Sequence, residues 1–160
     1  MIKRNKKIEN IRIRKVKEKD ICQIYNINKL LFKEDKWNYE EFERLLNFKK
    51  DLYLILAGEN LKADTTQICG FVIGKVVEDE GEVLKIGVDL PFQGRGIGRK
   101  LLENLLLKFR QRGVKKVYLE VRKSNKRAIN LYKSLHFRKI GERKKYYGKE
   151  DALVFVYEFL

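Results

Sequence analysis

Apolar residues recur along the first half of the chain in patterns that predict strands and helices in turn. Ile11 and Ile13 alternate with basic residues, which indicates a half-buried strand. Asp20 precedes apolar positions that recur every three or four residues, so we expect it to cap a helix. Asn38 is followed three residues later by Glu41, which is the pattern of a capping box at the start of a second helix.

The middle of the chain has three apolar segments that predict strands, followed by a long helix. Residues 52–56 and 68–77 are typical of strands and are joined by a polar loop that contains Gly58. A turn then leads into a third strand that ends at Val88. The leucines that follow recur on one face of a helix, which we expect to end near Gly113.

The last third of the chain adds three strands and one helix. Residues 117–121 alternate between apolar and polar, as in a strand with one buried face. A helix over 125–135 and strands over 138–147 and 152–159 follow. The order β-α-α-β-β-β-α-β-α-β-β therefore predicts a three-layer α-β-α fold with about seven strands and four helices, in a single domain over 1–160.

Composition narrows the class of protein. No apolar run approaches the roughly 20 residues of a membrane span, and residues 1–7 are expected to form a flexible basic arm rather than a secretory signal. Cys22 and Cys69 are isolated, so we expect reduced, buried thiols in a cytoplasmic protein. The single histidine, His136, has no partner at metal-ligand spacing, and no metal site is expected.

The formal net charge of +15 is unevenly distributed. Residues 1–19 contain nine basic and two acidic side chains, and residues 99–127 contain eleven and two. Residues 20–83 contain eight basic and thirteen acidic side chains. This asymmetry predicts a basic face that receives an anionic ligand and a separate, more acidic face.

A glycine-rich segment, Gln-Gly-Arg-Gly-Ile-Gly-Arg over 93–99, separates the strand ending at Val88 from the long helix. Backbone N–H groups and the positive end of the helix dipole converge there, which favours a phosphate group. Glycine at 94, 96 and 98 leaves no side chain to keep an anion from the backbone. Neither G-x-G-x-x-G nor G-K-[ST] is present. A loop that only turns the chain is the alternative.

The spacing Q-x-x-G-x-G resembles the acetyl-CoA pyrophosphate loop of the GCN5-related N-acetyltransferases (GNAT). Within that superfamily, three segments resemble the RimI-like and archaeal-type protein N-terminal acetyltransferases, which include ribosomal-protein alanine acetyltransferases. They are Leu119-Glu120-Val121-Arg122 with Ser124-Asn125, Ala128 and Leu131-Tyr132; Leu135-His136-Phe137; and Tyr146-Tyr147 with Glu150-Asp151-Ala152. His136 stands where the group has glycine, at a turn position that favours a positive φ. The resemblance implies the GNAT fold, with a mixed, mostly antiparallel sheet.

The resemblance also implies acetyl-CoA as cosubstrate and no metal. The pyrophosphate would bind the glycine-rich segment, and the pantetheine would lie along the strand ending at Val88, where that strand and the next splay apart. The Val88 N–H would stabilise the oxyanion. Asn125 is also a helix cap by its position. The implied binding residues are Ile86, Gly87, Val88, Gln93, Gly94, Arg95, Gly96, Ile97, Gly98, Arg99 and Asn125.

Acyl transfer to an amine requires a neutral amine, a stabilised oxyanion and a proton for the leaving thiolate. By resemblance, Glu120 is the general base, acting through a water, and Tyr132 donates a proton to the sulfur of CoA. The alternatives are an ion pair of Glu120 with Arg122 or a nearby lysine, and a core-packing role for Tyr132. Both cysteines lie outside the motifs, so direct transfer is expected.

The acceptor is expected to be an α-amine. An N-terminal amine has a pKa near 8, so about a tenth of it is neutral at pH 7, far more than of a lysine. The resemblance implies a protein N-terminus beginning with Ala or Ser, such as that of a ribosomal protein, bound by Trp37, Tyr146 and Tyr147. Trp37 as a core anchor is the alternative. The short segment between Tyr147 and Glu150 resembles the compact archaeal enzymes.

Two other functions remain open from the sequence. A small polyamine or aminoglycoside is an alternative acceptor, received by the acidic region over 34–43. A non-catalytic module that binds the ribosome or RNA through the basic arm is the third interpretation. The arm has neither interleaved aromatic residues nor a known RNA motif. No membrane partner is expected.

Overall fold

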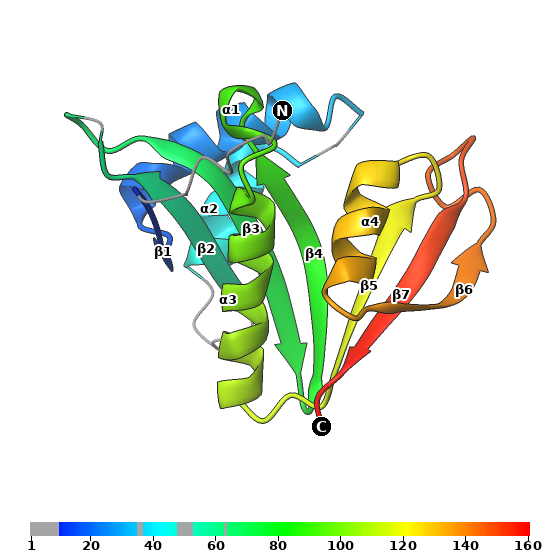
Figure 1. The fold of residues 1–160 in the computed structure, drawn as a ribbon. Coiled ribbons are helices and arrows are strands. Elements are labelled where there is room, and N and C mark those ends of the chain that lie inside the picture. The colour runs from blue at the N-terminus through cyan, green and yellow to red at the C-terminus, as the bar shows by residue number, and fades with distance from the viewer. Residues whose placement is uncertain (1–9, 35–36, 48–52, 63) are drawn as a thin grey trace, which may run out of the picture.

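The computed structural model describes residues 10–34, 37–47, 53–62 and 64–160, and the basic arm expected over 1–7 lies outside them. These residues form one seven-stranded sheet with helices on both faces (Figure 1). The strands are β1 (Ile11–Lys15), β2 (Tyr53–Asn60), β3 (Ile68–Val77), β4 (Glu80–Val88), β5 (Lys116–Arg122), β6 (Arg138–Arg143) and β7 (Ala152–Glu158). The helices are α1 (Ile21–Leu31), α2 (Tyr39–Leu46), α3 (Ile97–Gln111) and α4 (Lys126–Ser134), with short 3-10 helices η1 (Glu18–Asp20) and η2 (Leu90–Phe92). The expected three-layer α/β architecture is confirmed.

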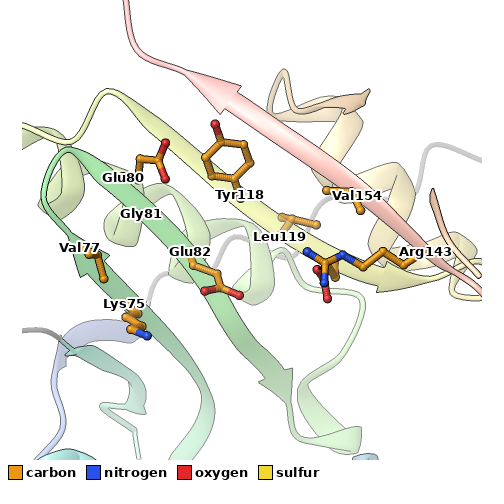
Figure 2. A pocket seen from close by; sticks show the side chains of 10 residues that line it. Lys75, Val77, Glu80, Gly81, Glu82, Tyr118, Leu119, Arg143 and Val154 are labelled. Carbon is orange, nitrogen blue, oxygen red and sulfur yellow. The ribbon is translucent and has the colours of Figure 1, made fainter. Parts of the chain in front are cut away.

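The strand order is β1-β2-β3-β4-β5-β7-β6, and every neighbouring pair is antiparallel except β4 and β5. The parallel pairing of β4 with β5 runs only from Glu80 and Lys116 to Val83 and Leu119. Beyond that point both strands continue, to Val88 and Arg122, without pairing to each other. The two strands therefore diverge toward their carboxyl ends, as Figure 1 shows for the whole sheet and Figure 2 from close by.

Helices α3 and α4 cover one face of the sheet, and α1 and α2 cover the other. Helix α3 lies very close to β3 and β4 because glycines face it there. A Cβ atom at Gly74 would be 2.6 Å from the ring of Phe109, so this position requires glycine. On the opposite face, Phe42 of α2 contacts Phe71 of β3 with ring centroids 6.3 Å apart.

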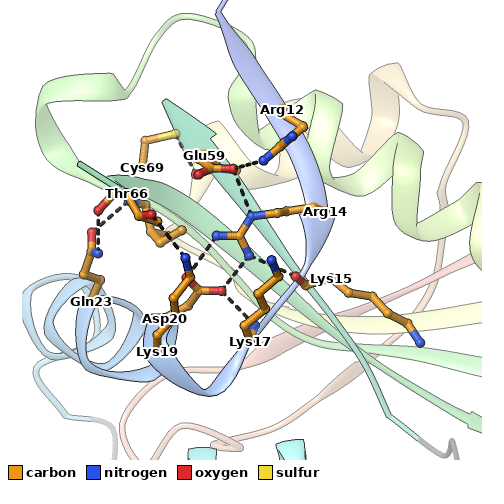
Figure 3. A network of polar contacts seen from close by, with 12 residues as sticks. Arg12, Arg14, Lys15, Lys17, Lys19, Asp20, Gln23, Glu59, Thr66 and Cys69 are labelled. Atoms are coloured by element: carbon orange, nitrogen blue, oxygen red, sulfur yellow. Dashed lines mark hydrogen bonds and ion pairs between the residues drawn. The ribbon is translucent and has the colours of Figure 1, made fainter. Parts of the chain in front are cut away.

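Asp20 does not cap α1, contrary to the sequence-based expectation. Its buried carboxylate instead binds the guanidinium of Arg14 at 2.6 and 3.0 Å and accepts a hydrogen bond from the Lys17 N–H at 2.7 Å (Figure 3). Arg14 also donates to Glu59 at 3.0 Å. Burial alone would raise the pKa of Asp20, but the hydrogen bonds from Arg14 and Lys17 hold that pKa below its usual value. The network joins β1, β2 and the start of α1.

Removing the Asp20 carboxylate takes away two of the hydrogen bonds of the mostly buried Arg14 guanidinium and leaves Glu59 as its remaining ion-pair partner. We expect Asp20→Ala to lower the free energy of unfolding at pH 7 by about 2 kcal/mol, the range for hydrogen bonds to a charged group. Because the folded-state pKa is depressed, this stabilisation is complete above about pH 4, the unfolded pKa, and is lost as pH falls through the folded pKa. Urea titrations at pH 7 and below pH 4 check both effects. Asp79→Ala, which breaks an exposed pair with Lys115, is the control; an equal loss there would contradict the prediction.

Three other local expectations are corrected. Strand β6 ends at Arg143 rather than near 147, because Lys145 has a φ of +52° and Gly148 a φ of +77°, which no strand continues through. Strand β2 extends to Asn60, so Gly58 lies in a strand and not in a loop. Cys22 is exposed rather than buried, whereas Cys69 is buried as expected.

Three other local features agree with the sequence. The capping box at the start of α2 is present, with the Glu41 N–H donating to Asn38 at 3.0 Å and the Asn38 N–H donating to Glu41 at 2.7 Å. Helix α3 ends two residues before Gly113. His136 has a φ of +69° in the turn after α4, as expected for a position that the resembling group fills with glycine.

Candidate active site

The glycine-rich segment forms the entry into α3. Gly94 and Gly96 have φ angles of +77° and +82°, which are accessible to glycine and strained for other residues. Gly96 is the N-cap of α3, no side chain caps this helix end, and its first turn contains no acidic residue. Ile97 and Gly98 begin a helix of 15 residues, so their N–H groups lie at the positive end of its dipole. This end of α3 is suited to bind an anion.

Side chains around the segment fix its shape and add positive charge. The Gln93 amide donates to the Val88 carbonyl at 2.9 Å and accepts from Arg127 at 3.0 Å, which ties the loop to β4 and α4. The guanidinium of Arg95 lies 5.5 Å from the centre of the Phe92 ring. Arg99 bonds to Glu103 and to Ser134, both at 3.0 Å, so its bonds in this structure go to α3 and α4.

The end of β4 offers a free strand edge beside this anion site. Ile86, Gly87 and Val88 lie beyond the last residue of β4 that pairs with β5, so an extended ligand can bond to this edge of the strand, apart from the Val88 carbonyl, which accepts from Gln93. Asn125, at the start of α4, caps that helix by accepting from the Ala128 N–H at 3.2 Å, as expected. The expected cosubstrate residues therefore lie around one end of the gap between β4 and β5.

A cavity of about 280 Å³ lies over the paired ends of β4 and β5 (Figure 2). Figure 2 shows Arg143 reaching in from the β6 side toward Leu119, with Glu82 on the β4 side. Sequence reasoning did not single out most of the residues that line this cavity, since no local motif marks them. The lining residues are Lys75, Val77, Glu80, Gly81, Glu82, Tyr118, Leu119, Glu120, Arg143 and Val154.

Glu120 lies in this cavity with 18% of its side chain exposed. Its carboxylate pairs with the Arg143 guanidinium at 2.9 Å. A hydrogen bond to Glu120 raises the pKa of Tyr146. The expected alternative partners, Arg122 or a lysine, are thus replaced by Arg143 of β6.

Tyr132 lies on the opposite face of the sheet from Glu120, in the core under α3 and α4. It lies on α4, is 5% exposed, and packs against Phe137 and Phe155 with ring centroids 5.9 and 6.4 Å apart. Burial strongly raises the pKa of its hydroxyl, with a further contribution from Tyr147. Burial, and then the negative charge of Glu120, raises the pKa of Tyr147 to about 12. Tyr147 thus interacts electrostatically with both Glu120 and Tyr132, the two expected catalytic residues, which lie on opposite faces of the sheet.

Trp37 lies between α1 and α2, as expected, and packs on Phe42 with ring centroids 5.4 Å apart. The ammonium of Lys85 on β4 lies 4.5 Å from the centre of the Trp37 ring and 4.9 Å from that of Phe32. Burial lowers the pKa of Lys85 to about 8. Trp37 is thus both a packing residue and part of an aromatic site that holds a cation beside the gap.

Among the described residues, no group of three or more His, Cys, Asp or Glu side chains is arranged to hold a metal ion. Within the same residues, no helix is long and apolar enough to cross a membrane.

The sequence pattern of the acetyltransferase (GNAT) family matches residues 19–137. The chain belongs to this family. The [ribosomal protein bS18]-alanine N-acetyltransferase of Salmonella typhimurium is 43% identical over 116 residues, which is 70% of each chain. The crystal structure of the ribosomal-protein-S18-alanine N-acetyltransferase from Escherichia coli superimposes with a TM-score of 0.79 at 31% identity, covering 92% of this chain and 93% of that one.

A more distant structural relative shares the fold alone. The NatC complex bound to Gag peptide and CoA contains a chain with a TM-score of 0.83 and 20% identity, covering 94% of this chain and 99% of that one. The GNAT assignment accounts for the diverging strands and the glycine-rich entry into α3, the two features that define the candidate site.

Proposed function

We propose that this GNAT protein transfers the acetyl group of acetyl-CoA to the α-amine of a protein N-terminus that begins with Ala or Ser. The observation that carries the proposal is the gap between β4 and β5. It has an anion site at one end, a carboxylate on one face and a buried tyrosine on the other. The relatives named for bS18 alanine acetylation support a ribosomal protein of that kind as the acceptor.

The chain's own residues fit acetyl-CoA, which supplies an activated thioester. The N–H groups at the start of α3 and the guanidinium of Arg127 suit the pyrophosphate. The free edge of β4 from Ile86 to Val88 suits the amides of the pantetheine, in the manner of an added strand. The Val88 N–H is our proposed donor to the oxyanion.

Glu120 and Tyr132 divide the proton transfers between them. Glu120 accepts a proton from the incoming ammonium through a water, and Arg143 and Tyr146 hold its carboxylate in place. Tyr132 is protonated at neutral pH because burial raises its pKa, so it donates a proton to the leaving thiolate. The neutral amine attacks the thioester carbonyl, and the nitrogen passes its second proton to water as the C–S bond breaks and the thiolate takes the proton of Tyr132. Glu120 and Tyr132 return to their starting states by proton exchange with solvent, with a net release of one proton.

The acceptor peptide would reach the gap between two aromatic walls. Trp37 stands on the α1–α2 side, and Tyr146 and Tyr147 form a T-shaped pair, 5.0 Å between ring centroids, on the β6–β7 side. An α-amine suits a carboxylate base better than a lysine does, because more of it is neutral at pH 7.

Matched peptides test the proposal. Every peptide contains one internal lysine. One set begins with a free Ala or Ser, and the matched set has the same sequences with a blocked N-terminus. Mass spectrometry after incubation with acetyl-CoA is expected to locate the acetyl group on the α-amine of the first set. Modification confined to lysine side chains would overturn the proposal.

A small polyamine is a second candidate acceptor, favoured by the carboxylates of Glu80, Glu82 and Glu120 in the cavity. Lys75 and Arg143 line the same cavity and weaken its attraction for a polycation. Release of free CoA with spermidine, and none with peptides, would favour this acceptor.

Gly96→Val tests the anion site. A branched side chain is strained at a φ of +82° and would stand between the first N–H groups of α3 and the pyrophosphate. We expect the affinity for acetyl-CoA to fall by about tenfold to a hundredfold. Calorimetric titration with CoA measures this directly. Gly141→Val, where a Cβ has open space and φ is not positive, is the control; equal losses in both would contradict a local role for Gly96.

A further inference from the structure

Arg122 is the last residue of β5, two positions after Glu120 and therefore on the same face of the sheet. The proton transfers proposed above do not use it. Its guanidinium contacts two segments that are far apart in the sequence. One Nη atom lies 3.2 Å from Glu34, just after α1, and the other lies 3.4 Å from Glu150, just before β7. The same guanidinium lies 4.4 Å from the centre of the Tyr147 ring.

We propose that Arg122 is a positioning residue that ties the two walls of the acceptor entrance together and holds Tyr147 in its pair with Tyr146. This inference rests on the proposed function of the site. It assigns Arg122 to acceptor binding rather than to acetyl-CoA binding, because its partners lie on the α1–α2 and β6–β7 sides and not at the start of α3.

The contacts of Arg122 differ in strength. The Glu34 side chain is 81% exposed, so water screens its ion pair with Arg122 and this is the weaker of the two ion pairs. Glu150 is better fixed, because its carboxylate also accepts from the Ser124 N–H at 2.7 Å. The guanidinium of Arg122 lies over the half-buried Tyr147 ring. A planar guanidinium stacks on an aromatic ring better than the ammonium of a lysine does. Arg122 is thus anchored on the β6–β7 side and reaches across to Glu34.

Tyr147 links Arg122 to the catalytic pair. The positive charge of Arg122 opposes the burial that raises the pKa of Tyr147, and Tyr147 in turn contributes to the raised pKa of Tyr132. Without the guanidinium, the Tyr147 ring keeps its contact with Tyr146 but loses its contact with the last residue of β5. A displaced Tyr147 would misplace the first residue of the peptide while leaving the anion site unchanged.

Steady-state kinetics of Arg122→Gln, with peptide and acetyl-CoA varied separately, test the inference. We expect the KM for the peptide to rise about tenfold, with the KM for acetyl-CoA within about twofold of wild type. Arg122→Lys keeps the charge but not the planar stacking group, and is expected to recover only part of the loss. Glu34→Gln is expected to change the peptide KM by less than about threefold.

Arg138→Gln is the matched control. Arg138 forms an ion pair with Glu158, 2.7 Å between the two side chains, outside the gap, and we expect wild-type kinetics from this variant. An unchanged peptide KM in Arg122→Gln would overturn the inference. An equal rise in both KM values would also overturn it. That result would mean that Arg122 acts on acetyl-CoA binding, by way of Glu150 and Ser124 at the start of α4.

Hydrogen exchange separates this inference from the proposed function. Arg122→Gln is expected to speed amide exchange both in the segment around Glu34 and in 145–150, with no change in α3. Faster exchange in both segments supports the bridge even if no peptide proves to be a substrate. Faster exchange in only one of them, or in neither, would contradict it.

Discussion

Glu120→Gln is expected to lower turnover by about 10²–10⁴-fold, the range for a lost general base, while CoA binding stays nearly intact. Glutamine keeps the size of the side chain and an oxygen for Arg143 and Tyr146, but it cannot accept the proton of the amine. Saturating kinetics from pH 6 to 9, together with CoA titration, measure the two effects separately.

The control for this variant is Glu158→Gln. Glu158 is also a strand carboxylate paired with an arginine, Arg138, but it lies outside the cavity. We expect it to retain wild-type turnover. If Glu120→Gln also retained wild-type turnover throughout this pH range, the base would have to be another group.

Tyr132→Phe is expected to lower turnover by about 10²–10³-fold with little change in either KM. The ring remains packed against Phe137 and Phe155, so the variant loses only the hydroxyl that donates a proton. Because burial raises the pKa of Tyr132, deprotonation of this residue is not expected to reduce the wild-type rate below pH 10. Stopped assays of CoA release across this range, for both proteins, check the rate and its pH dependence.

Tyr157→Phe is the control for the loss of a hydroxyl. Tyr157 also packs on Phe137, with ring centroids 5.4 Å apart, but it lies on β7 outside the proposed catalytic group. Its turnover is expected to match wild type. Equal activity of Tyr132→Phe and wild type would leave Tyr132 as a core residue only.

The sequence predicts most of the fold because most of it depends on local patterns. The box formed by Asn38 and Glu41, and the cap at Asn125, need only neighbours three residues away, and both are present. Asp20 has the same local appearance as a cap, but its partner Arg14 comes from a strand before the helix. An ion pair with a residue of another element overrides the local preference of Asp20 for capping the helix. The sequence around Asp20 does not predict that ion pair.

The site is predictable in part. Family resemblance predicts Glu120 and Tyr147 as site residues, but no resemblance or spacing predicts Arg143 as the partner of Glu120. The pairing of β6 with β7 shifts by one residue between Lys139 and Gly141. Because side chains alternate between faces, this bulge moves Arg143 onto the face that Glu120 occupies. An uninterrupted strand would place Arg143 on the opposite face.

The short pairing between β4 and β5 has a mechanical consequence. Four residue pairs at one end join two half-sheets, β1 to β4 and β5 with β7 and β6, and past Val83 and Leu119 the two halves do not pair. In the part of the chain that the structure describes, the end of β4 therefore lacks backbone hydrogen-bonding partners on the side that faces β5. A molecule that supplies those hydrogen bonds completes the sheet, so the free energy of its binding is added to the stability of the folded chain. If acetyl-CoA binds along this edge as proposed, the cosubstrate is also a structural element.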